Sequence, residues 1–321
     1  MQVSVPSTAK SPAPADILQQ RASLLSHIRG FFAQRGVLEV TTPLMSPTAN
    51  PDPAIEPIMA GDSYLRTSAE FAMKRLLAGG SGDIYELGPV FRAGESGRMH
   101  APEFTMLEWY RCDWRYSELI AEVTELLHHV APGTFTGWPQ RVISYAELFA
   151  EFAAVDPHSA STSELAACCA GEPFRAAQMS RNDWLDLVLA TVIQPALPAR
   201  AITYVHEYPA DQAALAKIRA GTPPVAERFE LYLGQLELAN GYQELTDANE
   251  QRRRFNAQNK QRRQLGLAVL PIDEEFVAAL EQGLPECTGV ALGVDRLLMS
   301  ILDISDINEV LPIRTDSRER G

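Results

Sequence analysis

The spacing of apolar residues predicts an amphipathic helix near the start of the chain, over residues 16–34. Long side chains recur there every three or four positions, at Ile17, Arg21, Leu25, Ile28 and Phe32. This period places them on one face of a helix. Asp16 is placed to cap the start of the helix and Gly36 to end it. A short strand is expected next, over residues 37–40, before the stop at Thr42 and Pro43.

The remaining pattern alternates between strands and helices without a repeat. Residues 84–91 and 104–110 are typical of strands joined by a glycine-rich connection at 94–97, and a helix is expected at 117–130. Residues 132–224 form looser helical pieces, which we interpret as an insertion. The expected elements after it are strands within 227–245 and at 288–294, and helices at 247–265 and 296–302. This mixed order predicts an α+β fold on an antiparallel sheet.

Composition assigns the chain to the class of soluble globular proteins. Hydrophobic residues make up 46% and charged residues 21% of its 321 residues. Residues 1–15 are rich in Ser, Ala and Pro, which predicts a flexible arm in front of one domain at 16–321. That arm lacks the apolar core of a signal peptide, and no segment approaches the ~18 apolar residues of a membrane span. We therefore expect a cytoplasmic protein that does not associate with membranes.

Charge and cysteine content exclude two kinds of site. The chain carries 41 acidic and 28 basic residues, for a net charge of -13, which argues against a broad surface for nucleic acid. Small anions in a local basic pocket, or a basic protein partner, remain compatible with it. The four cysteines have no CxxC spacing, and Cys168 and Cys169 are adjacent, so buried thiols are favoured over a metal site or disulfides.

The stretch 227–238, ERFELYLGQLEL, alternates with period two. This places Glu230 and Tyr232 on one strand face and apolar residues on the other. If Gly234 and Gln235 form a two-residue turn, Tyr232 lies opposite Glu237, with Glu230 as its diagonal neighbour. Two carboxylates on one face suit a magnesium ion that bridges phosphates. The alternative is a half-exposed strand with solvated glutamates.

The stretch 288–296, TGVALGVDR, has one face nearly stripped of side chains. Gly289, Ala291 and Gly293 alternate with larger residues, so a flat ring or a ligand close to the backbone could lie there. Arg296 follows at a predicted helix start, where backbone N–H groups favour an anion. The alternative is tight sheet packing, with Asp295 as a helix cap and Arg296 on the surface.

The stretch 239–247, ANGYQELTD, offers polar residues for the same pocket. Asn240, Tyr242 and Glu244 share a strand face, but simple alternation would point that face away from Glu237. A bulge between residues 239 and 241 would bring both sets together, and Gly241 makes one plausible. A buried acid beside Tyr110 would then select an ammonium group. A structural hydrogen-bond cluster is the alternative.

Together these segments resemble the catalytic domain of class II aminoacyl-tRNA synthetases. Residues 36–43 (GVLEVTTP), 91–110 (FRAGESGRMHAPEFTMLEWY) and 289–296 (GVALGVDR) are similar to the three motifs of that family, in order. The stretches TSAE at 67–70, HAPEFTMLEWY at 100–110 and ELANGYQELTD at 237–247 are most similar to its lysine-specific branch. The resemblance extends along nearly the whole chain from residue 16. It also implies a homodimer, because the first motif lies at the dimer interface in that family.

The resemblance implies a role for each candidate residue. Arg92 and Arg296 would be catalytic, with Arg92 between the α-phosphate and the amino-acid carboxylate. The implied ATP site consists of Arg92, Glu95, His100, Phe104, Glu237, Leu238, Gly293 and Arg296, and the magnesium ligands are Glu230 and Glu237. The implied amino-acid site consists of Ser68, Glu70, Glu108, Tyr110, Asn240, Tyr242, Glu244 and Ala291. Glu70 would hold the amine nearer the carboxylate, and Tyr110 and Glu244 the distal ammonium.

The implied reaction is ATP-dependent activation of a lysine-like amino acid as its adenylate. Residues 1–15 are too few for the anticodon-reading barrel of lysyl-tRNA synthetases, so we do not expect tRNA as acceptor. The chain resembles instead the stand-alone ligases that attach (R)-β-lysine to a lysine of elongation factor P. Ala291 stands where lysyl-tRNA synthetases tend to have glycine, and its methyl group would crowd an α-amine more than a β-amine.

Two departures from the family pattern keep alternatives open. Arg92 is followed by Ala93 and Gly94 rather than by the common x-Glu, and Ala101 replaces a common asparagine. One alternative is an adenylate-forming enzyme with another acceptor, such as a small amine or tRNA. Another is a catalytically inactive synthetase-like binding module, because a fold does not determine a function.

Overall fold

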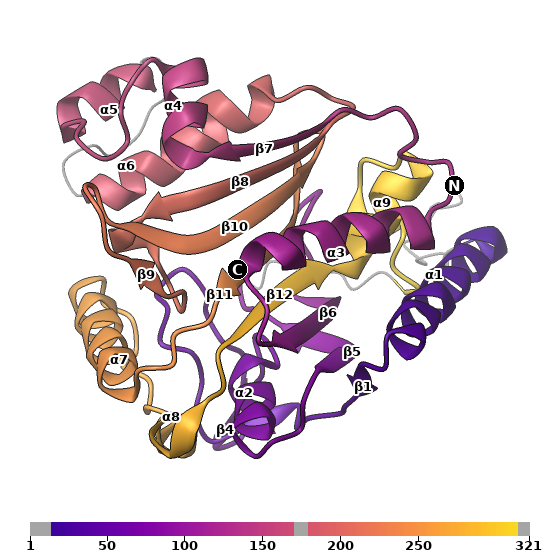
Figure 1. Ribbon diagram of the computed structural model, residues 1–321, viewed down its shortest axis with the longest axis horizontal. Helices are drawn as coiled ribbons and strands as arrows, with labels where there is room; N and C mark the ends of the chain where they lie inside the picture. The colour runs from indigo at the N-terminus through magenta and orange to yellow at the C-terminus, as the bar shows by residue number, and fades with distance from the viewer. Residues whose placement is uncertain (1–13, 170–178, 314–321) are drawn as a thin grey trace, which may run out of the picture.

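The computed structural model describes residues 14–169 and 179–313, which are built around a large mixed sheet. In spatial order its strands are β1 (Leu38–Glu39), β5 (Ile84–Phe91), β6 (Glu103–Cys112), β12 (Cys287–Gly293), β11 (Leu236–Gln243), β10 (Val225–Leu233), β8 (Ile202–Pro209) and β7 (Gln140–Ser144). Strand β9 (Ile218–Arg219) pairs with β10. Only the outermost pairs, β1–β5 and β7–β8, are parallel within this part of the chain. The predicted α+β fold on a mostly antiparallel sheet is confirmed (Figure 1).

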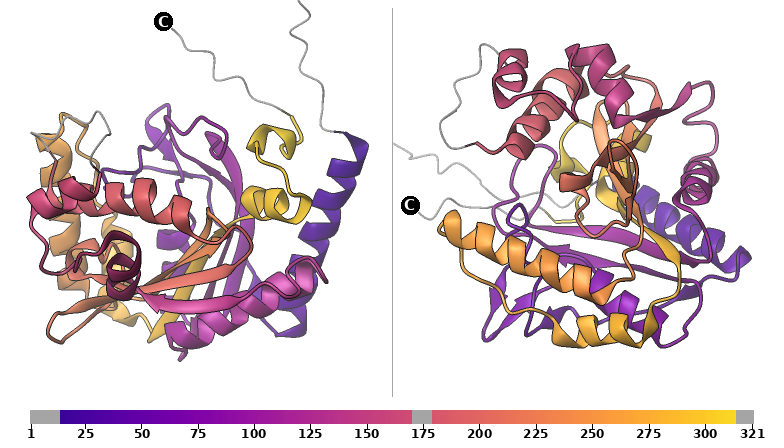
Figure 2. Two further views of the ribbon diagram at one scale, coloured as in Figure 1. Left: turned by 90° about the horizontal axis from the view of Figure 1, so that it is seen from above. Right: turned by 60° about the vertical axis from the view of Figure 1, so that its left-hand side comes forward.

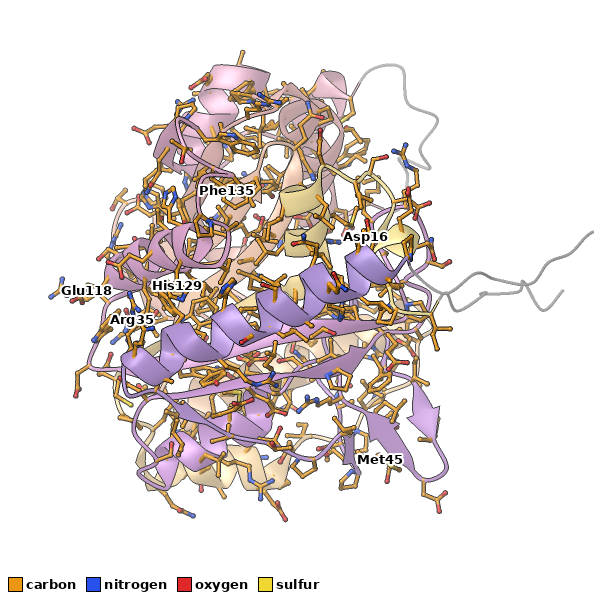
Figure 3. All side chains as sticks on the ribbon, turned by 90° about the vertical axis from the view of Figure 1, so that its right-hand side faces the viewer. Asp16, Arg35, Met45, Glu118, His129 and Phe135 are labelled. Carbon is orange, nitrogen blue, oxygen red and sulfur yellow. The ribbon has the colours of Figure 1, made fainter. Side chains whose placement is uncertain are left out.

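Three helices and their apolar residues cover one face of the sheet. They are α1 (Ala15–Gln34), α3 (Tyr116–Val130) and α9 (Val294–Leu302). The ring of Phe31 meets His129 edge-on at 5.4 Å, and the guanidinium of Arg35 donates to Glu125 at 2.7 Å. Figure 3 shows α1 in front of the sheet, with Arg35 close to His129 of α3. This face therefore holds the main hydrophobic core.

Two separate groups of helices cover the opposite face (Figure 2). One consists of α2 (Glu70–Ala78), α7 (Ala248–Gln264) and α8 (Glu274–Gly283), and packs on the β5–β6–β12 side. The other consists of α4 (Tyr145–Ala153), α5 (Thr162–Cys168) and α6 (Arg181–Val188), and packs on the β7–β8–β10 side. Short helical turns lie at Leu189–Ile193, Gln194–Ala196, Ala210–Gln212 and Ile307–Glu309. A small second sheet joins β2 (Met45–Ser46), β4 (Ser63–Leu65) and β3 (Met59–Ala60).

The segment 132–224 differs from the predicted helical insertion. It does contain α4, α5 and α6, but it also contributes β7 and β8 to the central sheet. Each of these strands borders a helical stretch, which obscured their period in the sequence. Helices α2 and α8 were not predicted either, and the predicted cap Asp16 lies inside the first turn of α1, after Pro14.

The hairpin of β10 and β11 confirms the predicted pairing and relocates the predicted bulge. Tyr232 pairs with Glu237 around a tight turn, as expected, but Leu231 pairs with Ala239. Leu238 is therefore the extra residue, and it brings Glu237 onto the face of Asn240. Gly241 has a different purpose, because a Cβ there would stand 2.4 Å from the ring of Phe229.

Three further predictions concern the N-terminal arm, membrane-spanning helices and the cysteines. Residues 1–13 of the predicted arm and residues 170–178 lie outside the described residues. In the described part, every helix is too short or too polar to traverse a bilayer. Of the four cysteines, which are free thiols, Cys169 and Cys287 are buried as predicted, whereas Cys112 and Cys168 are half-buried. The described residues hold no group of three or more metal-ligating side chains.

Candidate active site

A cavity of about 210 Å³ lies on the sheet face away from α1 and α3. Nearly every candidate residue lines it: Ser68, Glu70, Arg92, Glu95, His100, Phe104, Glu108, Tyr110, Glu237, Leu238, Asn240, Tyr242, Glu244, Ala291, Gly293 and Arg296. These residues come from segments far apart in the sequence. The structure therefore brings the candidate residues into one place, with Glu230 as the exception.

Two rows of paired residues cross the floor of the cavity from β11 through β12 to β6. In the first row Asn240 pairs with Ala291, which pairs with Glu108. In the second, Tyr242 pairs with Gly289, which pairs with Tyr110. Since neighbouring strands point aligned residues to the same face, each row presents its side chains together. Glycine at 289 is required here, because a Cβ would stand 2.3 Å from the Tyr110 ring.

Arg296 forms one wall of the cavity and is held by three contacts. Its guanidinium donates to the backbone oxygens of Met99, at 3.1 Å, and Glu237, at 2.9 Å. It also lies 2.7 Å from Nε2 of His100, and since arginine can only donate, this nitrogen accepts. Burial, and then the charge of Arg296, lower the pKa of His100, so the imidazole is neutral at pH 7. Arg296 is thus half-buried and fixed in the cavity wall rather than free on the surface.

Asp295 likewise does not cap its helix. Its carboxylate is buried, accepts from the backbone N–H of Thr105 at 2.6 Å and pairs with Arg21 of α1. Gly293 occupies the cap position of α9 without a side-chain hydrogen bond. Asp295 thus ties α1 and β6 to the start of α9 and so holds the adjacent Arg296 in position.

Arg92 begins the loop between β5 and β6 and faces the same cavity. Its backbone N–H donates to the oxygen of Pro102 at 2.9 Å, which closes the base of the loop. Its guanidinium donates to the backbone oxygen of Thr67 at 3.4 Å, and it lies 3.5 Å from Glu95 and 5.2 Å from the centre of the Phe104 ring. These are loose contacts compared with those of Arg296. The terminal nitrogens of Arg92 can therefore turn toward an anionic ligand.

The opposite end of the cavity is acidic. Glu108 accepts hydrogen bonds from Ser68 Oγ and Tyr110 Oη, both at 2.7 Å, and from the N–H of Ala69 at 3.2 Å. These donors favour the ionised form. Burial, and then the charge of Glu70, outweigh them and raise the pKa of Glu108 to about 7. An ammonium group bound here would lower that pKa again and hold the carboxylate ionised.

The other two carboxylates of this end share a buried lysine that the sequence analysis did not identify. Nζ of Lys74 lies 2.5 Å from Oε1 of Glu70 and 2.6 Å from Oε2 of Glu244. Glu70 and Lys74 are four residues apart on α2, so they share a helix face. That spacing was visible in the sequence, but the strand partner Glu244 was not.

Glu230 lies beside the cavity rather than in its wall, contrary to the sequence prediction. It is on the cavity face of β10 and pairs with Asn240, but its carboxylate contacts Arg228 and accepts from Tyr232 Oη at 2.6 Å. Arg228 also donates to Asn240 at 3.2 Å. Arg228 is a second residue that the sequence analysis overlooked, because in the alternation it looked like an ordinary strand charge.

Glu237 lies at the rim of the basic end, close enough to Glu230 for the two carboxylates to affect each other. Burial, and then Glu230, raise the pKa of Glu237, although three arginines oppose the rise. Among the described residues, no hydrogen bond is formed by the Glu237 carboxylate. Glu237, next to a place for phosphates, offers a carboxylate that magnesium accepts, since the ion needs few protein ligands, whereas Glu230 beside it is held by Arg228 and Tyr232. The residues present therefore fit a magnesium ion.

The fold and the cavity match one family along almost the entire chain. A model of the family described as tRNA synthetases class II (D, K and N) matches residues 7–314. The chain belongs to this class II synthetase family. The candidate residues that the resemblance names line the cavity, with the exception of Glu230.

Close relatives within this synthetase family share one name. The chain is 44% identical over 307 residues to the elongation factor P–(R)-beta-lysine ligase of Proteus mirabilis (strain HI4320), covering 92% of this chain and 93% of that protein. The ligase of the same name from Avibacterium paragallinarum is 43% identical, with 94% and 96% covered. The one from Haemophilus influenzae (strain PittGG) is 42% identical, with 94% and 97% covered. The chain therefore belongs with these ligases.

Proposed function

We propose that the chain activates (R)-β-lysine with ATP and transfers it to the ε-amine of a lysine on elongation factor P. The names of its relatives support this substrate and this acceptor. The observation that carries the proposal is the polarity of the cavity, with arginines at one end and three carboxylates at the other. Such a site suits a triphosphate on one side and an amino acid with two ammonium groups on the other.

The first step would join the two substrates across Arg92. A carboxylate oxygen of the amino acid attacks the α-phosphorus, the bond to the bridging oxygen breaks, and pyrophosphate leaves. Because both reactants are anions where they meet, a guanidinium between them lowers the barrier, and binding them in line supplies proximity. Arg296 and neutral His100 would hold the remaining phosphates, and the ring of Phe104 would face the adenine.

The second step would need no nucleophile from the enzyme. The neutral ε-amine of the acceptor lysine attacks the acyl carbon, the bond to AMP breaks, and the amine loses a proton as the amide forms. Magnesium, when bound by Glu237 with Glu230 beside it, would supply positive charge that stabilises the leaving pyrophosphate in the first step. Glu95, Leu238 and Gly293 would complete the nucleotide site, and Gly94 and Ala101 leave it without two side chains common in the family.

The acidic end would orient the amino acid. Glu70 and Glu108 would take the amine nearer the reacting carboxylate, with Ser68 supporting Glu108. Tyr110 and Glu244 would take the distal ammonium. The side-chain amide of Asn240 donates a hydrogen bond to Tyr242 Oη at 3.0 Å, so the two residues form a fixed side wall of the amino-acid site.

Ala291 is the proposed source of preference for a β-amine. It lies in the strand row between Asn240 and Glu108, so its methyl group projects into the amino-acid site. We expect Ala291→Gly to shift the ratio of kcat/KM values toward α-lysine by about 10- to 100-fold, as a methyl-sized difference allows. Pyrophosphate exchange with each isomer measures this ratio. A ratio equal to that of the wild type would contradict the assignment.

Pyrophosphate exchange also tests the activation step itself. We expect exchange of label between pyrophosphate and ATP that depends on magnesium and is stimulated by (R)-β-lysine. No exchange with any diamino acid would favour the inactive binding module. Exchange without transfer to elongation factor P would favour the adenylate-forming alternative, whose acceptor is a small amine or tRNA. Since the chain has a net charge of -13, we expect tRNA to be a poor acceptor.

A homodimer in the cytoplasm is the proposed physical state. Apolar side chains around the first motif are exposed, with Leu38 at 56%, Met45 at 51% and Met59 at 64%. Exposed apolar groups in one region indicate a surface that a partner covers. The class II resemblance implies that this partner is a second copy of the chain, because the first motif lies at the dimer interface in that family. Sedimentation of the purified protein tests this proposal.

A further inference from the structure

Lys74 lies behind the acidic end of the cavity and is almost fully buried. Its side chain is 1% exposed, and it is absent from the cavity wall, whereas Glu70 and Glu244 are part of it. Burial alone would lower the pKa of Lys74, but the charges of Glu244 and Glu70 and their hydrogen bonds raise it well above its usual value. Lys74 is therefore charged, and it contacts the pocket carboxylates from the side away from the ligand.

The charge balance of this end is incomplete. Glu70, Glu108 and Glu244 supply three carboxylates, and Lys74 is the one cation paired with them in the described part of the chain. Two negative charges thus stay uncompensated in a poorly solvated place when all three carboxylates are ionised. A ligand with two ammonium groups would balance them, and a ligand with one would not.

Lys74 also determines how Glu244 faces the ligand. Its ammonium holds Oε2, while Oε1 lies 2.6 Å from the place where a Cβ on Gly289 would stand. Gly289 is part of the cavity wall. The free oxygen of Glu244 is therefore directed to the cavity floor next to the Tyr110 ring.

We propose that Lys74 is a positioning residue that directs Glu244 at the distal ammonium of the amino acid and makes Glu244 easier to ionise when that ammonium binds. The inference rests on the proposed function and adds the source of the preference for a doubly charged substrate. Burial raises the pKa of Glu244 to about 8 in the empty cavity, and the charge of Lys74 opposes that rise, while Glu70 and Glu108 add to it. Without Lys74 the pKa of Glu244 is higher still, so an ammonium ligand must displace a more tightly held proton before it can pair with the carboxylate.

The direction of the pH effect follows from this linkage. In a variant without the Lys74 charge, the pKa of Glu244 rises further above about 8, so binding at pH 7 requires the loss of a more tightly held proton, and this penalty shrinks as the pH increases. Glu108 titrates near pH 7 in both proteins, and the amines of the ligand and the phenol of Tyr110 are also shared. The ratio of the two dissociation constants, variant over wild type, therefore reports on the two carboxylates that pair with Lys74, and the Glu244→Gln background below separates Glu244 from Glu70.

The test is calorimetric binding of (R)-β-lysine to the full chain at pH 7, 8 and 9. Lys74→Met keeps the length and apolar stem of the side chain but removes its charge. We expect at least ~10-fold weaker binding at pH 7, because one partner of a buried charge pair is removed, and a ratio that falls toward one at pH 9. The matched control is Lys217→Met, because Lys217 pairs with Glu286 at 3.0 Å but is 41% exposed. This control should bind as the wild type does at every pH.

Several outcomes would overturn the inference. A ratio that stays constant from pH 7 to 9 would mean that Lys74 has only a packing role beside Phe276, and unchanged affinity at pH 7 would also contradict it. If the methionine variant melts early, Lys74→Gln replaces it. In a Glu244→Gln background, Lys74→Met should weaken binding less than threefold, because Lys74 acts through Glu244. If the wild type itself does not bind (R)-β-lysine, the proposed function fails. If the wild type binds and Lys74→Met binds equally well, only the role of Lys74 fails.

Discussion

Replacing Arg92 with lysine is expected to lower kcat/KM for pyrophosphate exchange by about 10²- to 10³-fold. The contacts of the Arg92 guanidinium are long, at 3.4 Å to the backbone oxygen of Thr67, 3.5 Å to Glu95 and 5.2 Å to the centre of the Phe104 ring. It is therefore available to bridge the substrate carboxylate and the α-phosphate through two parallel pairs of hydrogen bonds. A lysine is a single point charge and can neutralise only one of these anions at a time.

The matched control for this variant is Arg253→Lys. Arg253 also pairs with a nearby glutamate, Glu250, but its side chain is 71% exposed on α7. The rate of pyrophosphate exchange by Arg253→Lys should stay within a factor of two of the wild-type rate. An equally small change for Arg92→Lys would contradict a catalytic role for Arg92. Melting temperatures of both variants should match that of the wild type, since neither arginine anchors the core.

Adding a single methyl group at Gly289 is expected to disable the amino-acid site. The new Cβ would stand 2.3 Å from the Tyr110 ring and 2.6 Å from Oε1 of Glu244. Tyr110 is only 2% exposed and cannot move away freely. Forcing an extra methyl group into packed surroundings costs about 1–3 kcal/mol. The KM for (R)-β-lysine in Gly289→Ala should rise by about 10- to 100-fold, while the KM for ATP changes little.

Gly30→Ala is the control for this substitution, because a Cβ at Gly30 meets nothing within 4 Å. It should leave both KM values unchanged. Equal increases in the KM for ATP and for the amino acid in Gly289→Ala would indicate general misfolding of the sheet. A KM for (R)-β-lysine like that of the wild type would contradict the place we assign to the distal ammonium.

The parts of the fold that could be predicted are those with an uninterrupted period. Alternation along residues 227–238 determined which side chains share a face, and the turn at Gly234 determined that Tyr232 pairs with Glu237. The need for a bulge followed from the same alternation. The position of the bulge at Leu238 could not be deduced, because Gly241 was the stronger local signal for a bulge. Glycine is needed at 241 for another reason, since a Cβ there would clash with the Phe229 ring.

The parts that could not be predicted depend on contacts between distant segments. Lys74 looks like an ordinary helix lysine until Glu244 is placed beside it. Glu230 looks like a pocket carboxylate until Arg228 and Tyr232 are seen to hold it. Likewise, β7 and β8 are recognised as strands of the main sheet only through their pairing with each other and with β10.

The most direct test of the account is the intact mass of elongation factor P after incubation with the chain, ATP, magnesium and (R)-β-lysine. We predict a gain equal to one lysyl residue on a single lysine, with no gain when Arg92→Lys replaces the wild type at the same concentration. An unmodified mass of elongation factor P, in a sample where the chain charges tRNA instead, would contradict the account.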